Sequence, residues 1–355
     1  MTTDDYEDNL STVEPTPLPP LVEPRRRRNR GRLRCILGVM VFGGLLVATR
    51  FSHLWSSFDV LSHFTLHFAI LTIAFAIGYF MPIGRVLTAI ILALIGFAVI
   101  GAYPQYVSEH PRVFSLVQAG EKPVRIMAFN SGFKNENTDA IVAEVRRLDP
   151  DVAILIELNG GKSVILKLLK DKYPFLVECI AEPYCHLAII SKIPISSGEA
   201  KGLWKGPPLI RATLGGNYSD ITVIGVHTIR TPHIRAQFGQ MRELADFLNG
   251  FPGSTIVAGD FNATPFARLF KMFSERTGLR RITNLPSWPG YVELPQLAID
   301  HIFLSSKIRV LEEARIGKRA GSDHYPVSAL LAVPSSPSAA PIGVGLYKTA
   351  PIQRR

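Results

Sequence analysis

The chain has 355 residues, of which 47% are hydrophobic and 19% charged, and its formal net charge is +10. At roughly 150 residues per domain, this length predicts about two structural units, and the composition excludes a collagen-like chain, wholesale disorder and a disulfide-dense miniprotein. The positive mean hydropathy, combined with so few charges, indicates membrane-spanning segments.

The first 34 residues predict a disordered cytoplasmic tail. Residues 1–24 are acidic and rich in proline, with too little apolar surface to offset the entropy of ordering. Residues 25–34 contain seven arginines. Such a cluster can bind nucleic acid or anionic lipid, but directly before an apolar segment it is typical of a positive-inside membrane anchor.

Three uncharged, mainly apolar segments predict three transmembrane helices within residues 35–108. They cover residues 35–49, 60–84 and 86–108. The second and third are long enough to cross a hydrocarbon core of about 30 Å, whereas the first is short and is followed by Arg50. A cleaved signal peptide is the alternative for the first segment.

The arginine cluster also predicts the orientation of the chain. It keeps the N-terminus in the cytoplasm, so three crossings place everything after residue 108 outside, and cleavage of the first span leaves the same outcome. His63 and His67, four residues apart in the second segment, could share a metal ion or a proton, although a polar patch near the outer interface is the simpler interpretation.

A linker over residues 109–122 leads into an α/β domain at residues 123–333. Apolar and β-branched runs predict strands, and apolar residues at helical spacing predict helices at 138–148 and 233–248. The expected strands cover residues 123–130, 151–159, 176–180, 186–190, 209–214, 221–228, 255–262, 299–306, 308–316 and 324–333. The tail at 334–355 is rich in Ser, Pro and Ala and is expected to be disordered.

Two cysteines, Cys179 and Cys185, flank five residues between two expected strands. A hairpin of this length can bring their Cα atoms within the distance that a disulfide requires. Two unrelated buried thiols are the alternative. Because the domain is expected outside, in an oxidising compartment, the disulfide is favoured.

Polar residues follow or open six of the buried strands, where an unpaired polar side chain would be costly unless it binds something. These residues are Asn130, Glu157, His227, Asp260, Asn262, Asp300, His301, Asp323 and His324. They indicate convergence on one rim of a layered sheet. Carboxylates, amides and imidazoles without thiolates form a hard ligand set that suits Mg²⁺ or Mn²⁺, and phosphoryl chemistry uses such an ion.

The same residues lie in the motifs MAFN, LIELNG, GVHT, GDFNATP, AIDHIF and SDHYPV. In this order they resemble the signature of the endonuclease/exonuclease/phosphatase (DNase I-like) superfamily over about residues 123–333. The resemblance is closest to bacterial membrane-anchored members, and the Trp288-Pro289 element also fits that branch. It implies an α/β fold in which a two-layered β-sandwich is flanked by helices and preceded by the three transmembrane helices.

The resemblance also implies a role for each motif residue. Glu157 would be the principal metal ligand, supported by Asn130 and Asp323. Asp260 would orient or deprotonate the attacking water.

The remaining motif residues would act on the phosphate. Asn262 would hold the phosphate or the water, and His227 would contact the scissile phosphate. Asp300 would pair with His324 and favour its imidazolium form, which stabilises charge on phosphorus. His301, on the opposite face of its strand, is expected to be a packing residue.

Departures from the family pattern leave the substrate open among nucleic acid, a phospholipid head group and a small phosphoester. Secreted DNases of this family carry an arginine where this chain has Asn159, and the extensions typical of inositide 5-phosphatases are missing. Arg211 could meet a substrate phosphate or simply pair with an acidic residue. Inner-membrane lipids are expected to surround the spans, and no obligate protein partner is evident.

The sequence therefore predicts a hydrolase of phosphoester bonds that depends on Mg²⁺ or Mn²⁺. It would be a multi-pass protein of the bacterial inner membrane whose catalytic domain faces the periplasm. A catalytically silent receptor of the same fold, with a pocket for a phosphorylated ligand, is the alternative.

Overall fold

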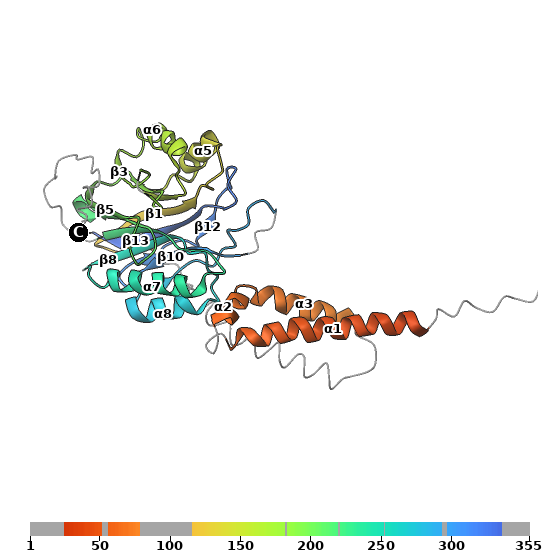
Figure 1. Cartoon of the computed structure of the whole chain (residues 1–355). Coiled ribbons are helices and arrows are strands. Elements are labelled where there is room, and N and C mark those ends of the chain that lie inside the picture. Colours follow the sequence, from red (N-terminus) through yellow and green to blue (C-terminus); the bar gives the residue numbers. More distant parts are fainter. Residues whose placement is uncertain are drawn as a thin grey trace, which may run out of the picture.

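The computed structural model describes residues 25–51, 56–78, 116–181, 183–218, 221–251, 253–292 and 297–335. It contains a layered α/β domain and a group of N-terminal helices that project from one side of that domain (Figure 1).

Two sheets form the centre of the domain. The first has the strand order β11-β13-β1-β2-β4-β3, with β12 also paired to β13. Its strands are β1 (Glu121–Asn130), β2 (Val152–Ile156), β3 (Phe175–Glu178), β4 (Leu187–Ser191), β11 (Arg309–Val310), β12 (Arg315–Ile316) and β13 (Val327–Pro334).

The second sheet has the strand order β5-β6-β7-β8-β10-β9. Its strands are β5 (Ile195–Lys201), β6 (Leu209–Leu214), β7 (Ile221–His227), β8 (Ser254–Asp260), β9 (Arg280–Arg281) and β10 (Asp300–Leu304). Both sheets are mixed, because β1 pairs with β2 and β7 pairs with β8 in parallel while the other pairs are antiparallel.

The sheets pack face to face, and alternate residues of their strands build the core between them. Ile126 of β1, Ile154 of β2 and Ile256 of β8 belong to this core and are completely buried. The sheets approach so closely that a Cβ added to Gly225 of β7 would lie 2.5 Å from the Ile154 side chain. The glycine of the GVHT motif is therefore a packing requirement.

Helices cover the outer face of each sheet, which gives four layers (Figure 1). The first sheet carries α5 (Thr138–Leu148) and α6 (Val164–Leu168), and the second carries α7 (Ile234–Leu248) and α8 (Arg268–Thr277). Two short 3₁₀ helices lie at Gly160–Ser163 and Gly216–Tyr218. The expected fold of a two-layered sandwich flanked by helices is confirmed for this domain.

The expectation of three transmembrane helices is not confirmed. Among the described residues, only Arg30–Thr49, within α1 (Arg25–Thr49), is long and apolar enough to cross a membrane, by length and composition alone. A signal sequence near an N-terminus has the same character. The expected third span, residues 86–108, lies outside the described residues.

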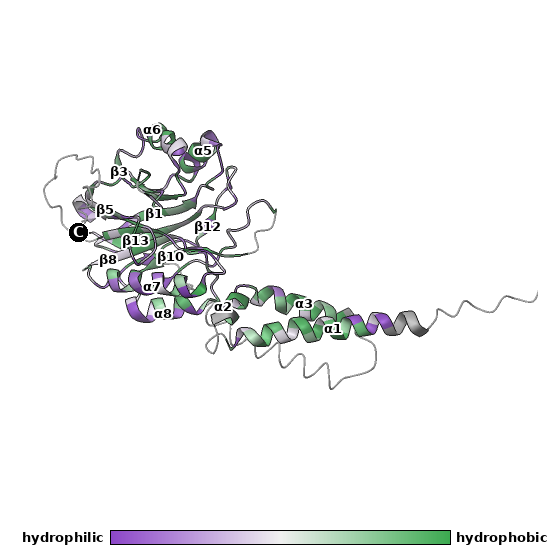
Figure 2. Ribbon diagram, in the orientation of Figure 1, coloured by the Kyte–Doolittle hydropathy of each residue, from purple (hydrophilic) through white to green (hydrophobic). Residues whose placement is uncertain are grey.

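The expected second span, residues 60–84, is interrupted in the structure. It is divided between α2 (Ser56–Ser62) and the shorter apolar helix α3 (Thr65–Gly78), with a turn at His63 and Phe64. α3 packs along α1, and Figure 2 shows the two as a largely hydrophobic pair that projects from the domain. At this turn the His63 ring contacts the α/β domain, with Nδ1 at hydrogen-bond distance from Thr264.

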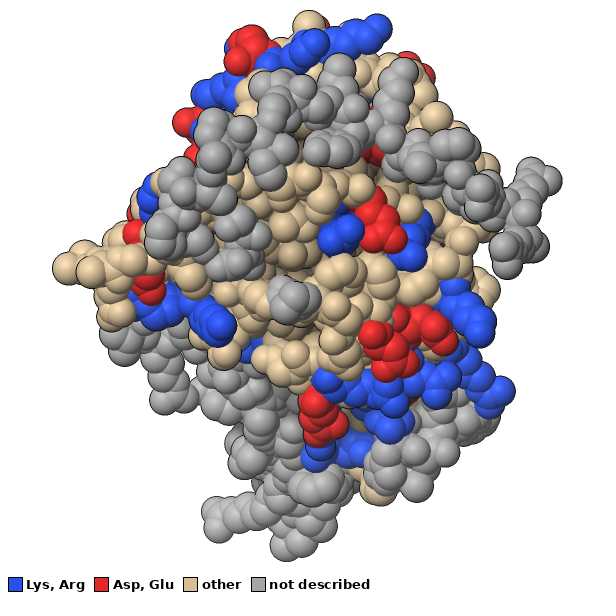
Figure 3. All heavy atoms as spheres, turned by 90° about the vertical axis from the view of Figure 1, so that its left-hand side faces the viewer, with Lys and Arg blue, Asp and Glu red and all other residues tan. Residues whose placement is uncertain are grey.

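Charged side chains are mixed on the face of the domain that points away from the helix pair. Figure 3 shows Lys and Arg next to Asp and Glu on this face, both near its middle and toward its lower edge. Nucleic-acid grooves need positive charge gathered along one path. On the part of this face that the structure describes, positive charge is not gathered along one path.

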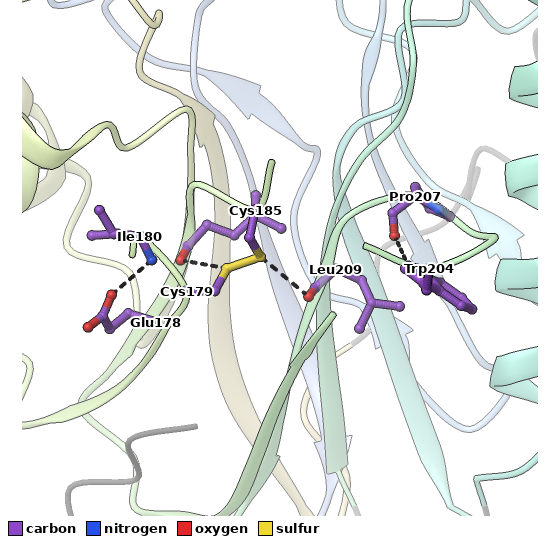
Figure 4. The surroundings of a disulfide bond; sticks show 8 residues. Glu178, Cys179, Ile180, Cys185, Trp204, Pro207 and Leu209 are labelled. Atoms are coloured by element: carbon purple, nitrogen blue, oxygen red, sulfur yellow. Dashed lines mark hydrogen bonds between the residues drawn. A yellow bond between two sulfur atoms is a disulfide. The ribbon is translucent and has the colours of Figure 1, made fainter. Parts of the chain in front are cut away.

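Cys179 and Cys185 are joined by a disulfide in the structure, with their Cα atoms 5.7 Å apart (Figure 4). They lie between the antiparallel neighbours β3 and β4, and both side chains are buried in the core between the sheets. The backbone N–H of Cys179 donates to the Leu187 carbonyl at 3.0 Å, which fixes the start of this hairpin.

We expect reduction of this disulfide to lower the free energy of unfolding by roughly 2 kcal/mol, the chain-entropy value for so short a loop. Urea unfolding of the wild-type protein with and without dithiothreitol measures the difference. The variant C179A/C185A controls for other effects of the reductant and should not respond to it. Equal midpoints for oxidised and reduced wild-type protein would contradict the expectation.

Candidate active site

Strand register places three of the predicted residues in one row across the second sheet. His227 at the end of β7 is paired with Asp260 at the end of β8, and Asp260 is paired with Asp300 at the start of β10. Paired residues on neighbouring strands point to the same face. By alternation this is the inner face, because Ala258 and Ile302 of the same strands belong to the core between the sheets.

The first sheet contributes Asn130 and Glu157 at the same rim. Asn130 ends β1 and is paired with Ile156, the last residue of β2, so Glu157 follows directly beside it. The Asn130 side chain crosses the sandwich, and its Nδ2 donates to Asp260 Oδ2 at 3.0 Å. The polar site therefore begins where the apolar core between the sheets ends.

Two site residues have a left-handed backbone that is uncommon outside glycine. The φ angle is 59° at Glu157 and 48° at Asn262. Local hydrogen bonds hold both: Phe133 N–H donates to Glu157 Oε2 at 2.5 Å, and Asn262 Nδ2 donates to the Thr228 carbonyl at 3.0 Å. Such strain persists where the surroundings impose it, and it is concentrated at functional sites.

His324 lies buried between two carboxylates. Its Nδ1 is 2.8 Å from Asp300 Oδ2, and its Nε2 is 3.8 Å from Asp260 Oδ2. Burial alone would lower the pKa of His324, but the negative charges of Asp300 and Asp260 outweigh it and raise the pKa to about 10. The imidazole is therefore protonated at neutral pH.

Asp260 is held as a buried carboxylate with a raised pKa. Burial is the main cause, and the charge of Asp300 adds to it, whereas His324 and His227 act in the opposite direction. The Asn262 backbone N–H donates to Asp260 Oδ1 at 2.8 Å. A carboxylate with a raised pKa is a stronger base than an exposed one.

His227 completes this side of the site. Its Nε2 is 3.7 Å from Glu157 Oε1 and 3.7 Å from Asp260 Oδ2, and its side chain is partly exposed. It therefore faces the open space between residues from both sheets.

The oxygen donors fit a hard divalent cation. Glu157 and Asp323 offer carboxylate oxygens, and the amide oxygen of Asn130, which accepts the Gly132 N–H at 3.0 Å, keeps a second lone pair. Lys162 lies near these two carboxylates: burial lowers its pKa, and the charges of Glu157 and Asp323 only partly oppose that shift. The buried group Asp260, Asp300 and His324 also has ligand atoms within 4.8 Å of one another, but a protonated His324 has no lone pair to offer a metal ion.

Several residues around the site were not predicted. Lys162 is 2% exposed, and its Nζ donates to Ser131 Oγ at 3.0 Å and to the Gly132 carbonyl. Burial is the main influence on Lys162 and lowers its pKa to about 8. Ser287 Oγ donates to Asp300 Oδ2 at 2.6 Å. Neither residue belongs to a recognisable motif, so no sequence signal pointed to them.

Two predicted residues lie apart from this cluster. Arg211 on β6 forms an ion pair with Glu199 at 3.2 Å and stacks 4.8 Å from the ring centroid of Phe251, the second of the two alternatives. His301 points away from Asp300 and packs 4.9 Å from the ring of Phe270, as expected for a packing residue. Burial lowers the pKa of His301 to about 3, so it is neutral.

Solved structures with low sequence identity are similar to this domain. They include beta toxin from Staphylococcus aureus with bound magnesium ions, sphingomyelinase C from Streptomyces griseocarneus and D. rerio TDP2 complexed with a single-strand DNA product. Their identities are 18%, 15% and 14%, and their TM-scores are 0.46, 0.47 and 0.49. Each match covers 59% of this chain and 99% of the other chain.

A curated relative matches only a part of the chain. Over 100 residues, 28% of this chain, the sequence is 29% identical to dihydroorotate dehydrogenase (quinone) from Shewanella piezotolerans. The match spans about a quarter of that relative's length, 27%.

The Endonuclease/Exonuclease/phosphatase family model matches residues 127–324, which contain every motif residue described above and more than half of the chain. With both mixed sheets and their helices in place, this protein is a member of the endonuclease/exonuclease/phosphatase family.

Proposed function

We propose that this protein is a divalent-metal-dependent hydrolase of phosphoester bonds, anchored in the bacterial inner membrane and facing the periplasm. The observation that carries the proposal is the contact of buried His324 with Asp300 and Asp260, next to the oxygen donor Glu157. A fixed imidazolium, a carboxylate base and hard ligands are the groups that transfer of a phosphoryl group to water requires.

In this proposal Glu157 and Asp323 hold the cation, and the Asn130 amide oxygen supports it. A bound Mg²⁺ or Mn²⁺ supplies a Lewis acid that polarises a phosphoryl oxygen and neutralises developing charge. The indole N–H of Trp288 donates to Asp323 Oδ2 at 3.3 Å and so orients this carboxylate.

Asp260 takes the proton from the attacking water. Asn130 and the Asn262 N–H hold one carboxylate oxygen each, so the base is positioned before substrate binds. One hydrogen of Asn262 Nδ2 is donated to the Thr228 carbonyl, which leaves Oδ1 to accept from the attacking water and the second N–H to donate to a phosphate oxygen. The water oxygen bonds to phosphorus, the bond from phosphorus to the leaving oxygen breaks, and the leaving oxygen is protonated.

His324 stabilises the charge that develops on the phosphoryl oxygens. Asp300 accepts from Nδ1, which leaves the Nε2–H to donate to the substrate. His227 contacts the phosphate from the other side of Asp260. His324 is fixed by its buried partner Asp300, so this donor needs little reorganisation during the reaction.

The supporting experiment measures hydrolysis by the full-length protein in detergent with Mg²⁺, Mn²⁺ or EDTA. The substrates are bis-p-nitrophenyl phosphate, plasmid DNA, RNA, sphingomyelin and phosphoinositides. We expect at least one phosphodiester to be cleaved, with activity lost in EDTA and restored by the metal. Binding of a phosphorylated ligand without any turnover would replace the hydrolase by a receptor of the same fold.

The membrane orientation gives a separate prediction. With the arginine cluster of residues 25–34 in the cytoplasm and an odd number of crossings, such as the three expected from the sequence, alkaline phosphatase fused after Val333 should be active. A fluorescent protein that matures only in the cytoplasm should stay dark at the same junction. Fluorescence there would overturn the periplasmic placement without affecting the hydrolase proposal.

A further inference from the structure

A cavity of about 470 Å³ lies between the turn that joins α2 to α3 and the loops of the α/β domain. His63 and Phe64 of the turn form one wall, and Arg230, Asn262, Trp288 and Leu297 belong to the opposite walls. The cavity is therefore built jointly by the N-terminal helices and the domain that carries the active site.

Buried hydrogen bonds fix the turn against the catalytic loop. His63 Nδ1 lies 3.1 Å from the backbone nitrogen of Thr264 and 3.2 Å from Thr264 Oγ1. Asp59 of α2 accepts the backbone N–H of Arg268, the first residue of α8, at 3.2 Å. Thr264 is two residues beyond Asn262 in the GDFNATP motif. The helices are thus positioned directly beside the catalytic residues.

Two wall residues connect the cavity to the active site. Asn262 also bonds to Asp260, and Trp288 lines the cavity while its indole N–H donates to Asp323 at 3.3 Å. A phosphate held by the active site would therefore have the remainder of its molecule beside this cavity.

The walls combine apolar surface with one available cation. Phe64, Trp288 and Leu297 are apolar or aromatic, and Arg230 is exposed and forms no ion pair with any side chain in the described part of the chain. An arginine without a carboxylate partner is suited to a phosphate oxygen. A volume of this size can hold a polar head group. It offers no extended path of cations for a nucleic-acid strand.

The apolar surface of the helix pair begins at the rim of this cavity. Phe64 is followed on α3 by Leu66, Ile70 and Ile77, whose side chains are 45%, 65% and 64% exposed. In Figure 2 the hydrophobic helix pair meets the domain at this end. With this pair in a bilayer, the cavity opens at the membrane surface, where lipid phosphates lie.

We infer that the substrate of the active site is a membrane phospholipid whose phosphodiester head group enters this cavity from the bilayer. The inference rests on the proposed hydrolase function and names its substrate class. Arg230 binds a phosphate oxygen, Phe64 and Leu297 contact the glycerol and the first acyl carbons, and the chains remain along α3. The water oxygen bonds to phosphorus and one phosphorus–oxygen ester bond breaks. The products are a phosphomonoester and the alcohol that leaves with the oxygen of the broken bond.

The test uses the full-length chain reconstituted in vesicles of phosphatidylglycerol and phosphatidylethanolamine. Lipid hydrolysis and hydrolysis of bis-p-nitrophenyl phosphate are measured on the same preparation, and their ratio is the readout. We expect R230Q and F64A each to lower this ratio by about tenfold, the scale of one lost charge-assisted or buried apolar contact. R230K should have a ratio between those of R230Q and the wild type, because lysine keeps the charge without the bidentate geometry.

Matched controls separate the cavity from general effects on the protein. R242Q removes an exposed arginine of α7, and L168A removes a similarly exposed apolar side chain of α6, both outside the cavity. Both should keep the wild-type ratio. Cleavage of bis-p-nitrophenyl phosphate and DNA without lipid, or equal loss of both activities in R230Q and F64A, would overturn the lipid inference and leave the hydrolase standing. A wild-type protein inactive on every phosphodiester would overturn both.

Discussion

Asp260→Asn should lower kcat on any cleaved phosphodiester by on the order of 10³-fold, within the range for losing a general base. The amide retains the size of the carboxylate and can still accept one hydrogen bond, but it cannot take a proton from water. Because Glu157 and Asp323 are unchanged, we expect Mn²⁺ to raise the melting temperature of this variant and of the wild type alike.

Glu157→Gln is the matched comparison for this result. It should reduce turnover and also weaken the thermal stabilisation by Mn²⁺, because the principal charged ligand is lost. Mn²⁺ titrations followed by kinetics and by thermal unfolding separate the two effects. An Asp260→Asn protein as active as the wild type would refute the assignment of the base.

His324→Ala should lower kcat by on the order of 10²-fold or more, the usual effect of removing one preorganised donor to developing charge. Asp300→Asn should have a similar effect, because Asp300 accepts from His324 Nδ1 and is the main charge that raises its pKa. If the two residues act as a unit, the double variant should be little worse than the poorer single variant.

Ser287→Ala provides the control for this pair. It removes the hydroxyl that donates to Asp300 Oδ2 and accepts from the backbone N–H groups of Ile299 and Asp300, while the charge of Asp300 remains, so a loss of only several-fold is expected. Steady-state kinetics of the wild type, the two single variants and the double variant give the coupling between His324 and Asp300. Circular dichroism checks that each of these proteins and Ser287→Ala is folded. Fully multiplicative losses for His324→Ala and Asp300→Asn would show that the two residues act independently.

The sequence predicted regular elements well where hydrophobic periodicity was strong. The helix expected at 138–148 is α5, Thr138–Leu148, and the strand expected at 209–214 is β6, Leu209–Leu214. β5 was missed because its residues are all partly exposed and include Ser, Gly and Lys, which lack an apolar pattern. The expected strand at 308–316 is divided into β11 and β12, both paired to β13.

The N-terminal region shows the limit of counting apolar residues. The composition of residues 60–84 suits one long span, yet the turn at His63 and Phe64 separates α2 from α3. His63 at this turn contacts Thr264, 201 residues away in the chain, and no local pattern contains that information. The interpretation of His63 as a polar patch near the interface similarly omitted this partner.

The residues of the candidate site could be predicted from the sequence, but the hydrogen bonds between them could not. Strand ends identified Asn130, Glu157, Asp260 and Asp300 because polar residues interrupt apolar runs there. The direct bond from Asn130 to Asp260 depends on how two sheets pack, which sequence spacing does not specify. Lys162 was missed for a related reason, since a lysine in a loop is normally exposed.

The row formed by His227, Asp260 and Asp300 makes the site intolerant of insertions and deletions in three strands. Side chains alternate between faces, so adding or removing one residue within β10 would turn Asp300 toward the outer helices and put one of its sequence neighbours in its place at the rim. Length changes in these strands would abolish the chemistry even where the sheet still formed. Variation in substrate is therefore confined to the loops and helices around the rim, where length can change without moving the row.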